Sequence, residues 1–334
     1  MSTASDSLPP DLAALLAGSL DAPRLAVRIA PPDIRAWLPG NTLPGVWSFA
    51  AEAPGPHVVV NALMHGNEIA GAVLLDGWLR AGLRPLRGRL SLVFANLEAY
   101  ARFDRDDPTA SRFLDEDMNR LWDAETLEGG RRSCELRRAR VLRPVFDAAD
   151  IVLDLHSMLW PGEPLLLCGA APRAAALAQR LGTPGLAVAD QGHEGGMRLL
   201  DYLPFSAPGG QRTAMLLEAG SHWEPATVAQ MQASAARLLR LLGVVAVDHP
   251  ALAPAAEFAP GRRAEVTRTV TAASHNFSFL RPYRGGHVVA RRNTLIALDG
   301  EVEIRTPHDD CVMVMPNLRV GRGQTAVRLA RFAA

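Results

Sequence analysis

The sequence contains no lysine, and all 35 of its basic residues are arginines. This absence excludes a Schiff-base lysine, a lysine that acts as a general base, and the P-loop lysine that contacts a nucleotide phosphate. The chain also has no excess of charge of either sign, since 35 acidic residues balance the arginines. A broad basic face that binds nucleic acid needs such an excess, so we expect no nucleic-acid partner.

Cysteine is scarce, and Cys134, Cys168 and Cys311 lie far apart without a C-x-x-C pair. This pattern excludes a disulfide framework and a zinc site built from cysteines. No uninterrupted apolar run reaches the roughly 18 residues of a membrane-spanning helix. The first residues lack the basic and apolar regions of a secretory signal. We therefore expect a cytoplasmic protein with no membrane association.

The residues that are present are those of a folded α/β protein. Of 334 residues, 48% are hydrophobic, and this length suits one large domain with or without a small one. Short apolar runs predict buried strands, and apolar residues at helical spacing predict helices between them. The strands are expected at 58–63, 90–95, 151–155, 165–168 and 214–217, and the helices at 11–20, 68–81, 134–148, 174–181 and 226–242. This alternation predicts a mostly parallel, doubly wound sheet with helices on both faces.

The pattern changes after about His249. A linker-like stretch is followed by short β-prone runs that are separated by turn signals such as Gly285-Gly286 and Asp299-Gly300. We therefore predict an α/β domain over residues 1–251 and a small all-β domain over residues 252–334.

Three candidate metal ligands, His65, Glu68 and His156, are placed at the ends of predicted strands. In open α/β sheets, ligands bind outside the carboxyl ends of the strands. Two imidazoles and one carboxylate leave the fourth position on a zinc ion open, as a catalytic site requires. Asp154 lies two residues before His156 on the same face of its strand, where it is suited to orient that imidazole.

Two other segments place charged residues where they are candidates for a functional site. Residues 112–120 read R-F-L-D-E-D-M-N-R, and alone they also fit a solvated loop. Glu218 follows the apolar strand at 214–217, where burial of a carboxylate is costly unless it is compensated.

His193 and His222 are isolated in the sequence and are predicted as surface or packing histidines. Tyr283 is predicted as an ordinary aromatic of the β domain that has the reach to enter a cleft.

These segments, taken in order, resemble the succinylglutamate desuccinylase and aspartoacylase family, which is related to the zinc carboxypeptidases. The resemblance is carried by H-G-N-E at 65–68, R-F-x-x-x-D-M-N-R at 112–120, D-L-H at 154–156 and L-E-x-G at 217–220. The stretches T-P-H-D-D at 306–310 and V-M-P-N at 314–317 are similar to the C-terminal β domain of the desuccinylase branch. The resemblance extends from about residue 45 to the end.

The resemblance implies a sheet of the zinc carboxypeptidase type and a C-terminal β domain that caps the active site. It also implies a role for each matching residue. One zinc ion per chain would be bound by His65, Glu68 and His156, Arg112 would polarise the scissile carbonyl, Asn119 and Arg120 would bind a substrate carboxylate, and Glu218 would serve as general base and then general acid.

The activity implied is that of a zinc-dependent hydrolase that cleaves a small-molecule N-acyl amino acid to a carboxylic acid and a free amino acid, with an N-succinylglutamate-like substrate as the leading expectation. The alternative is a zinc carboxypeptidase that acts on small peptides; a capping β domain favours the deacylase. One departure concerns Pro208, because aspartoacylases carry a second carboxylate-binding arginine ten residues before the catalytic glutamate. Arg198 and Arg212 are the candidates to replace it. Whether the protein forms a homo-oligomer stays open.

Overall fold

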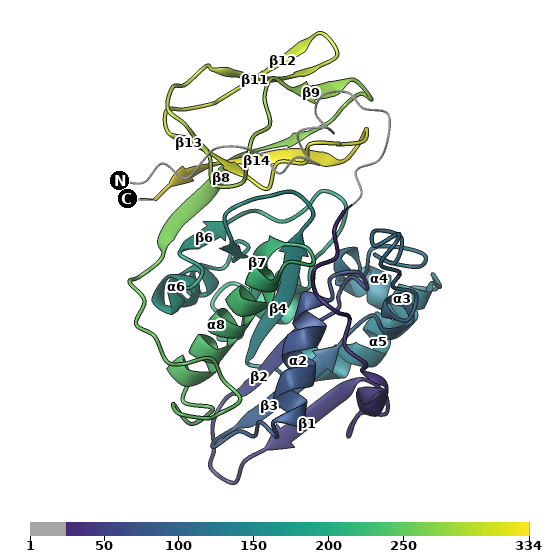
Figure 1. Cartoon of the computed structure of the whole chain (residues 1–334). Helices are drawn as coiled ribbons and strands as arrows, with labels where there is room; N and C mark the ends of the chain where they lie inside the picture. Colours follow the sequence, from purple (N-terminus) through teal and green to yellow (C-terminus); the bar gives the residue numbers. More distant parts are fainter. Residues whose placement is uncertain (1–24, 334) are drawn as a thin grey trace.

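The computed structural model describes residues 25–333, and the helix predicted over 11–20 lies outside that range. Figure 1 shows an α/β unit with a smaller unit of strands above it. In chain order the elements of the α/β unit are η1 (Arg35–Trp37), β1 (Val46–Ala50), β2 (His57–Ala62), α2 (Ala70–Arg80), β3 (Arg89–Phe94), α3 (Leu97–Tyr100), η2 (Met118–Arg120), α4 (Ala124–Glu128), α5 (Cys134–Asp147), β4 (Ile151–Met158), β5 (Leu165–Leu167), α6 (Pro172–Leu181), β6 (Leu186–Ala189), η3 (Leu199–Asp201), α7 (Leu203–Ser206), β7 (Thr213–Ser221) and α8 (Pro225–Leu241).

The predicted α/β class is confirmed. Every strand and helix predicted between residues 25 and 249 is present, while β1, β6 and the short helices were not predicted. The strands are ordered β1-β3-β2-β4-β7-β5-β6. The central strands β3, β2, β4 and β7 pair in parallel, and β1 and β5 are antiparallel to their neighbours β3 and β7. The sheet of this unit is therefore mostly parallel.

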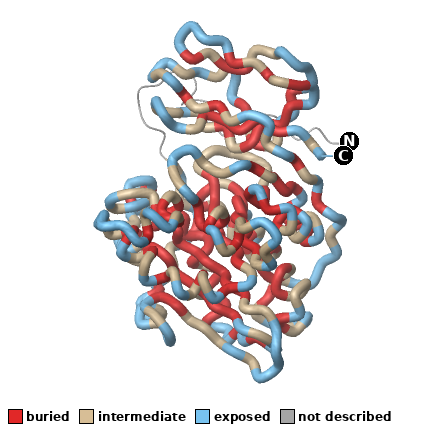
Figure 2. Tube along the Cα trace, turned by 180° about the vertical axis from the view of Figure 1, so that it is seen from behind, coloured by how far each residue is buried: buried red, intermediate tan, exposed pale blue. Residues whose placement is uncertain are grey.

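Helices cover both faces of this sheet, and alternate side chains of each strand pack against one layer or the other. Val58 and Val60 of β2 belong to the core that contains α2, α6 and α8, whereas Val59 belongs to the core that contains α5. Such period-2 alternation between two apolar layers is why the strands read as continuous apolar runs. Figure 2 shows buried segments running through the middle of both units.

Residues 262–332 contain strands and no helix: β8 (Arg262–Thr271), β9 (Phe277–Phe279), β10 (Val288–Val289), β11 (Leu295–Asp299), β12 (Val302–Arg305), β13 (Cys311–Val314) and β14 (Thr325–Phe332). Strand β8 pairs in parallel with β6 and antiparallel with β14, so the large sheet continues into this β unit without a break. A separate sheet, β12-β11-β9, completes the unit around its own apolar core. The predicted turn at Asp299-Gly300 joins β11 to β12, with Gly300 at a φ of 61°.

Strands β4 and β7 extend beyond their predicted ends. The apolar runs stop at Leu155 and Leu217, but the pairing continues, and His156 and Glu218 are direct partners in the β4–β7 register. The ladder can continue because the polar side chains that follow the apolar runs are buried among other polar groups. Hydrophobicity alone therefore marked both strand ends too early.

A buried carboxylate on α5 fixes the loop that precedes η2. Glu135 is fully buried and accepts the backbone N–H groups of Leu114 at 2.7 Å, Asp115 at 3.1 Å and Glu116 at 3.3 Å. It also accepts the Asn96 amide at 3.0 Å. Three of these four hydrogen bonds come from residues 114–116 and fix that loop to α5.

Replacing Glu135 with Ala should leave the buried Asn96 amide and three part-buried N–H groups without their acceptor, and a buried unsatisfied group costs about 1–3 kcal/mol. We expect the free energy of unfolding to fall by at least about 3 kcal/mol, as measured by urea denaturation. Glu128→Ala, on the exposed side of α4, is the control and should change it by less than about 1 kcal/mol. Equal effects of the two variants would contradict the role of Glu135.

Candidate metal centre and substrate cleft

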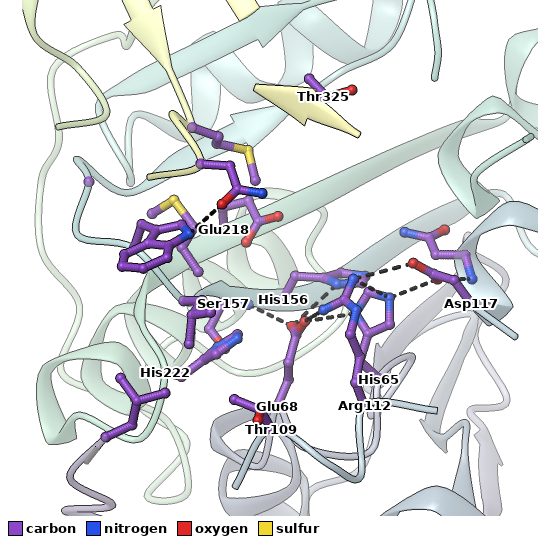
Figure 3. A pocket seen from close by; sticks show the side chains of 18 of the residues that line it. His65, Glu68, Thr109, Arg112, Asp117, His156, Ser157, Glu218, His222 and Thr325 are labelled. Carbon is purple, nitrogen blue, oxygen red and sulfur yellow. Dashed lines mark hydrogen bonds and ion pairs between the residues drawn. The ribbon is translucent and has the colours of Figure 1, made fainter. Parts of the chain in front are cut away.

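A cleft of about 1490 Å³ opens where the carboxyl ends of β2, β4 and β7 face the β unit. Its lining includes residues of the α/β unit such as His65 and Glu218, and residues of the β unit such as Asn317 and Arg328. Figure 3 shows the polar side chains that gather at its base. The cleft is therefore shared by both units.

His65 and Glu68 lie on a tight turn between β2 and α2. Gly66 is required there, because a Cβ at this position would lie 2.5 Å from backbone atoms of Ala99 and Tyr100. The Glu68 N–H donates to the His65 carbonyl at 3.2 Å, which closes the turn, and the Gly66 N–H donates to the Arg112 carbonyl at 3.0 Å. The turn thus brings both candidate ligands to one side and ties them to the loop that carries Arg112.

The three predicted metal ligands converge. His65, Glu68 and His156 are buried, and one ligand atom from each lies within 4.8 Å of the other two. The Nδ1 atom of His65 is 2.7 Å from Glu68 Oε1, and Nδ1 of His156 is 3.3 Å from Glu68 Oε2. Figure 3 shows the two imidazoles beside the Glu68 carboxylate. Both Nδ1 atoms therefore face the same carboxylate.

The opposite nitrogen of each imidazole contacts a second carboxylate. His65 Nε2 lies 2.9 Å from Asp117 Oδ1, and His156 Nε2 lies 2.9 Å from Asp154 Oδ2. The predicted contact of Asp154 is thus present, and Asn61 orients that carboxylate by donating to its other oxygen at 2.7 Å. Carboxylates at the outer nitrogen are typical of metal-binding histidines. Two imidazoles so oriented and one carboxylate fit a zinc ion.

Charge compensation in this group is strong. Burial alone would raise the pKa of Glu68, but His65 and His156 hold it well below its usual range. Burial would lower the pKa of His156, but Asp154 and Glu68 raise it well above its usual range. The Asp117 carboxyl is also mostly buried, and His65 and two arginines keep its pKa far below normal. Both carboxylates are therefore ionised, and Glu68 is available as a metal ligand.

Arg112, Asn119 and Arg120 line the cleft next to this group. Arg112 Nη2 lies 2.9 Å from His65 Nε2, and its Nη1 donates to Glu68 Oε1 at 3.3 Å. Asn119 accepts the Leu199 N–H with Oδ1 at 2.9 Å, which leaves its Nδ2 group as the donor for a ligand. Arg120 donates to the Asn119 carbonyl at 2.6 Å and lies 3.2 Å from His193 Nε2.

Glu218 lies across from the metal-ligand group in Figure 3. Its side chain is buried, and Oε2 has no hydrogen-bond partner among residues 25–333. Burial raises the pKa of Glu218 to about 8; the Glu68 charge adds to this effect, and His156 opposes it. A carboxyl with such a pKa is suited to exchange a proton near neutral pH.

The structure places four residues in or near the cleft that sequence reasoning missed or assigned elsewhere. Asp117 lies inside the 112–120 segment, and no local signal in the sequence assigns it a role. Ser157 donates its N–H to Glu68 at 2.8 Å, and its hydroxyl lies 2.6 Å from His222 Nδ1. Both His193 and His222 line the cleft, which was not predicted. His222 is also buried against Trp223, as predicted for a packing histidine.

His222 directly follows β7 and His193 lies in the loop after β6, so both reach the cleft at the ends of strands. Tyr283, in contrast, belongs to the core of the β unit, as predicted for an ordinary aromatic residue.

Neither of the two arginines that could replace the one missing at Pro208 is free to bind a substrate carboxylate. Arg198 lines the cleft, but its guanidinium donates to Asp190 and Asp201 over distances of 2.6–3.0 Å. Arg212 donates to the Asp147 carbonyl and does not contribute to the cleft lining.

The family model of the succinylglutamate desuccinylase/aspartoacylase catalytic domain matches residues 54–243. The chain belongs to this family. Its members are hydrolases that remove the acyl group from an N-acyl amino acid. Rat aspartoacylase is 30% identical over 119 residues, which are 33% of this chain and 36% of that protein. A probable aspartoacylase of Parasynechococcus marenigrum is 38% identical over 141 residues, or 39% of this chain and 44% of that one. These matches span less than half of each relative.

Solved structures extend the similarity to the whole fold. A succinylglutamate desuccinylase from Vibrio cholerae has a TM-score of 0.68 at 18% identity and covers 87% of this chain and 86% of its own. An aspartoacylase family protein from Mesorhizobium loti has a TM-score of 0.60 at 18% identity, with 86% and 89% covered. At this level of identity they establish the α/β fold with its large, mostly parallel sheet.

Within residues 25–333, none of the helices has the length and apolar character needed to cross a bilayer.

Asp117→Asn tests the metal centre. Losing the charged partner of His65 should weaken zinc affinity by roughly tenfold to a hundredfold, as measured by competition with a chelating dye. Asp104→Asn removes the same charge from an exposed position that does not line the cleft and should leave the affinity unchanged. The wild type should take up about one zinc ion per chain; no binding after reconstitution with zinc would contradict the centre.

Proposed function

We propose that the protein is a zinc-dependent amidohydrolase that cleaves an N-acyl amino acid, with an N-succinylglutamate-like substrate as the best fit. The products are a carboxylic acid and a free amino acid. The observation that carries this proposal is the buried group of His65, Glu68 and His156, which opens into a cleft next to Glu218. Family membership supports the reaction class.

A zinc ion bound by these three residues would supply an activated water and act as a Lewis acid on the amide carbonyl. Glu218 is assigned the role of general base, which accepts a proton of the attacking water and returns it to the leaving amine. Its raised pKa, about 8, supports both halves of that role.

The polar groups beside the centre are assigned to the substrate. Arg112 lies over His65 and Glu68, where its guanidinium is suited to stabilise the negative charge that develops on the carbonyl oxygen. The Nδ2 group of Asn119 and the guanidinium of Arg120 are assigned to a substrate carboxylate, which positions the amide for attack.

We further propose that residues 1–251 and 252–334 are two domains, of which the first is a zinc carboxypeptidase-type hydrolase and the second a cap. Trp160 Nε1 donates to Asn317 Oδ1 at 2.8 Å across the two units, and Gly162 pairs with Gly285. These contacts close one side of the cleft. A cleft closed in this way suits a small N-acyl amino acid better than a peptide.

Glu218→Gln tests the assigned general base. The variant should retain about one zinc ion per chain, because Glu218 is not among the converging ligands. Its kcat should fall at least about 100-fold, the usual contribution of general acid–base catalysis. Glu194→Gln, an exposed change near the cleft, is the control and should keep full activity. Full turnover by Glu218→Gln would remove Glu218 from this role.

The decisive experiment is a substrate panel assayed for the release of free amino acids by the zinc-loaded protein. It should contain N-succinylglutamate, N-acetylaspartate, other N-acyl amino acids, and peptides with free or blocked C-termini. We expect cleavage of N-acyl amino acids and little cleavage of peptides. Preferential cleavage of peptides with a free C-terminus would instead establish the zinc carboxypeptidase.

A further inference from the structure

A buried arginine of the β unit reaches the cleft. Arg328 lies on β14, in register with Val314 of β13 and Thr269 of β8, and its side chain is 8% exposed. It lines the cleft together with Arg120 and Glu218 of the α/β unit. The position is unusual, because arginine side chains are rarely this buried unless they are paired.

The Arg328 guanidinium is incompletely paired. Its Nε has no hydrogen-bond partner among residues 25–333. The Asp190 carboxylate lies 3.6 Å from Nε, too far for a good hydrogen bond. That carboxylate already accepts two hydrogen bonds from Arg198, at 2.7 and 2.8 Å. A buried donor without an acceptor is costly, so an orphan N–H on a cleft residue indicates an acceptor that comes from outside the chain.

The surroundings of Arg328 are rich in positive charge. Burial and the charges of Arg120, Arg328 and Arg198 together lower the pKa of His193 to about 3, so this imidazole is neutral. Asp117, the carboxylate closest to Arg120, is shared with His65 and Arg112. Arg328 likewise shares Asp190 with Arg198. An anion that enters this part of the cleft therefore meets two guanidiniums, neither of which has a carboxylate to itself.

We propose that Arg328 is a specificity-determining residue that binds a second carboxylate of the substrate, beyond the one assigned to Asn119 and Arg120. The proposal deepens the deacylase function proposed above and rests on it. Aspartoacylases bind this carboxylate with the arginine that is Pro208 here, and Arg198 and Arg212 are already engaged. Arg328 would supply the missing cation from the β unit. The planar fork of an arginine matches a carboxylate with two parallel hydrogen bonds.

Matched substrate pairs that differ in one carboxylate test the proposal. N-succinylglutamate is compared with N-butyrylglutamate, which lacks the carboxylate of the acyl group, and N-acetylaspartate with N-acetylasparagine, which lacks that of the side chain. We expect the wild type to prefer the carboxylate-bearing member of at least one pair. The pair that shows the preference identifies the end of the substrate that Arg328 contacts.

Arg328→Gln should reduce this preference in kcat/KM by about tenfold to a hundredfold, mainly through KM, because a hydrogen-bonded charge is lost. Arg331→Gln, an exposed change on the same strand, should retain it. Arg328→Lys keeps the charge without the bidentate fork and should be intermediate. It also serves as the test variant if the glutamine variant does not fold. A wild type without the preference, or equal losses on both members of a pair, would overturn the proposal.

Calorimetry separates this proposal from the deacylase function. If the zinc-loaded wild type cleaves none of the N-acyl amino acids, the deacylase function fails, and binding of succinate and of aspartate then tests the subsite alone. Binding that is lost in Arg328→Gln and retained in Arg331→Gln supports the subsite. A wild type that binds neither dicarboxylate overturns it.

Discussion

The arrangement of the site depends on one constraint, the burial of the Glu68 carboxylate at the edge of the sheet. An ionised carboxylate removed from water must be compensated by charge and hydrogen bonds. Here both histidine Nδ1 atoms, the Ser157 N–H and Arg112 surround it. Each imidazole in turn requires a fixed orientation, and Asp117 and Asp154 provide it from the outer side. The same contacts that make the carboxylate tolerable also define a place for a divalent cation.

The mostly parallel sheet explains why residues so distant in sequence meet at this carboxylate. Parallel strands end at one edge, so β2, β4 and β7 deliver the H-G-N-E turn, His156 and Glu218 to the same place. The β4–β7 register sets His156 beside Glu218. The loop that carries Arg112 and Asp117 has no strand of its own, and buried Glu135 on α5 fixes it instead through backbone hydrogen bonds.

The β unit is built into the same sheet rather than attached by a flexible linker alone. Strand β8 pairs with β6, so the orientation of β14 relative to the cleft is set by backbone hydrogen bonds. The arginines in a chain without lysine are then used in different ways. Arg198 is fully engaged with two aspartates and serves the structure, whereas Arg112, Arg120 and Arg328 face the space where a substrate would bind.

The sequence by itself determined the main strands and helices of the α/β unit, the fold class and the metal-ligand candidates. Apolar periodicity and the H-G-N-E, D-M-N-R, D-L-H and L-E-x-G segments are local signals. It did not reveal that β4 and β7 continue through His156 and Glu218. A polar residue after an apolar run is read as the end of a strand, and the sequence does not show that the fold buries it among other polar groups. Only the tertiary structure paired Asp117 with His65 and brought His222 and Arg328 into the cleft. These contacts join residues far apart in the chain, and no local pattern encodes which buried charge will find which partner.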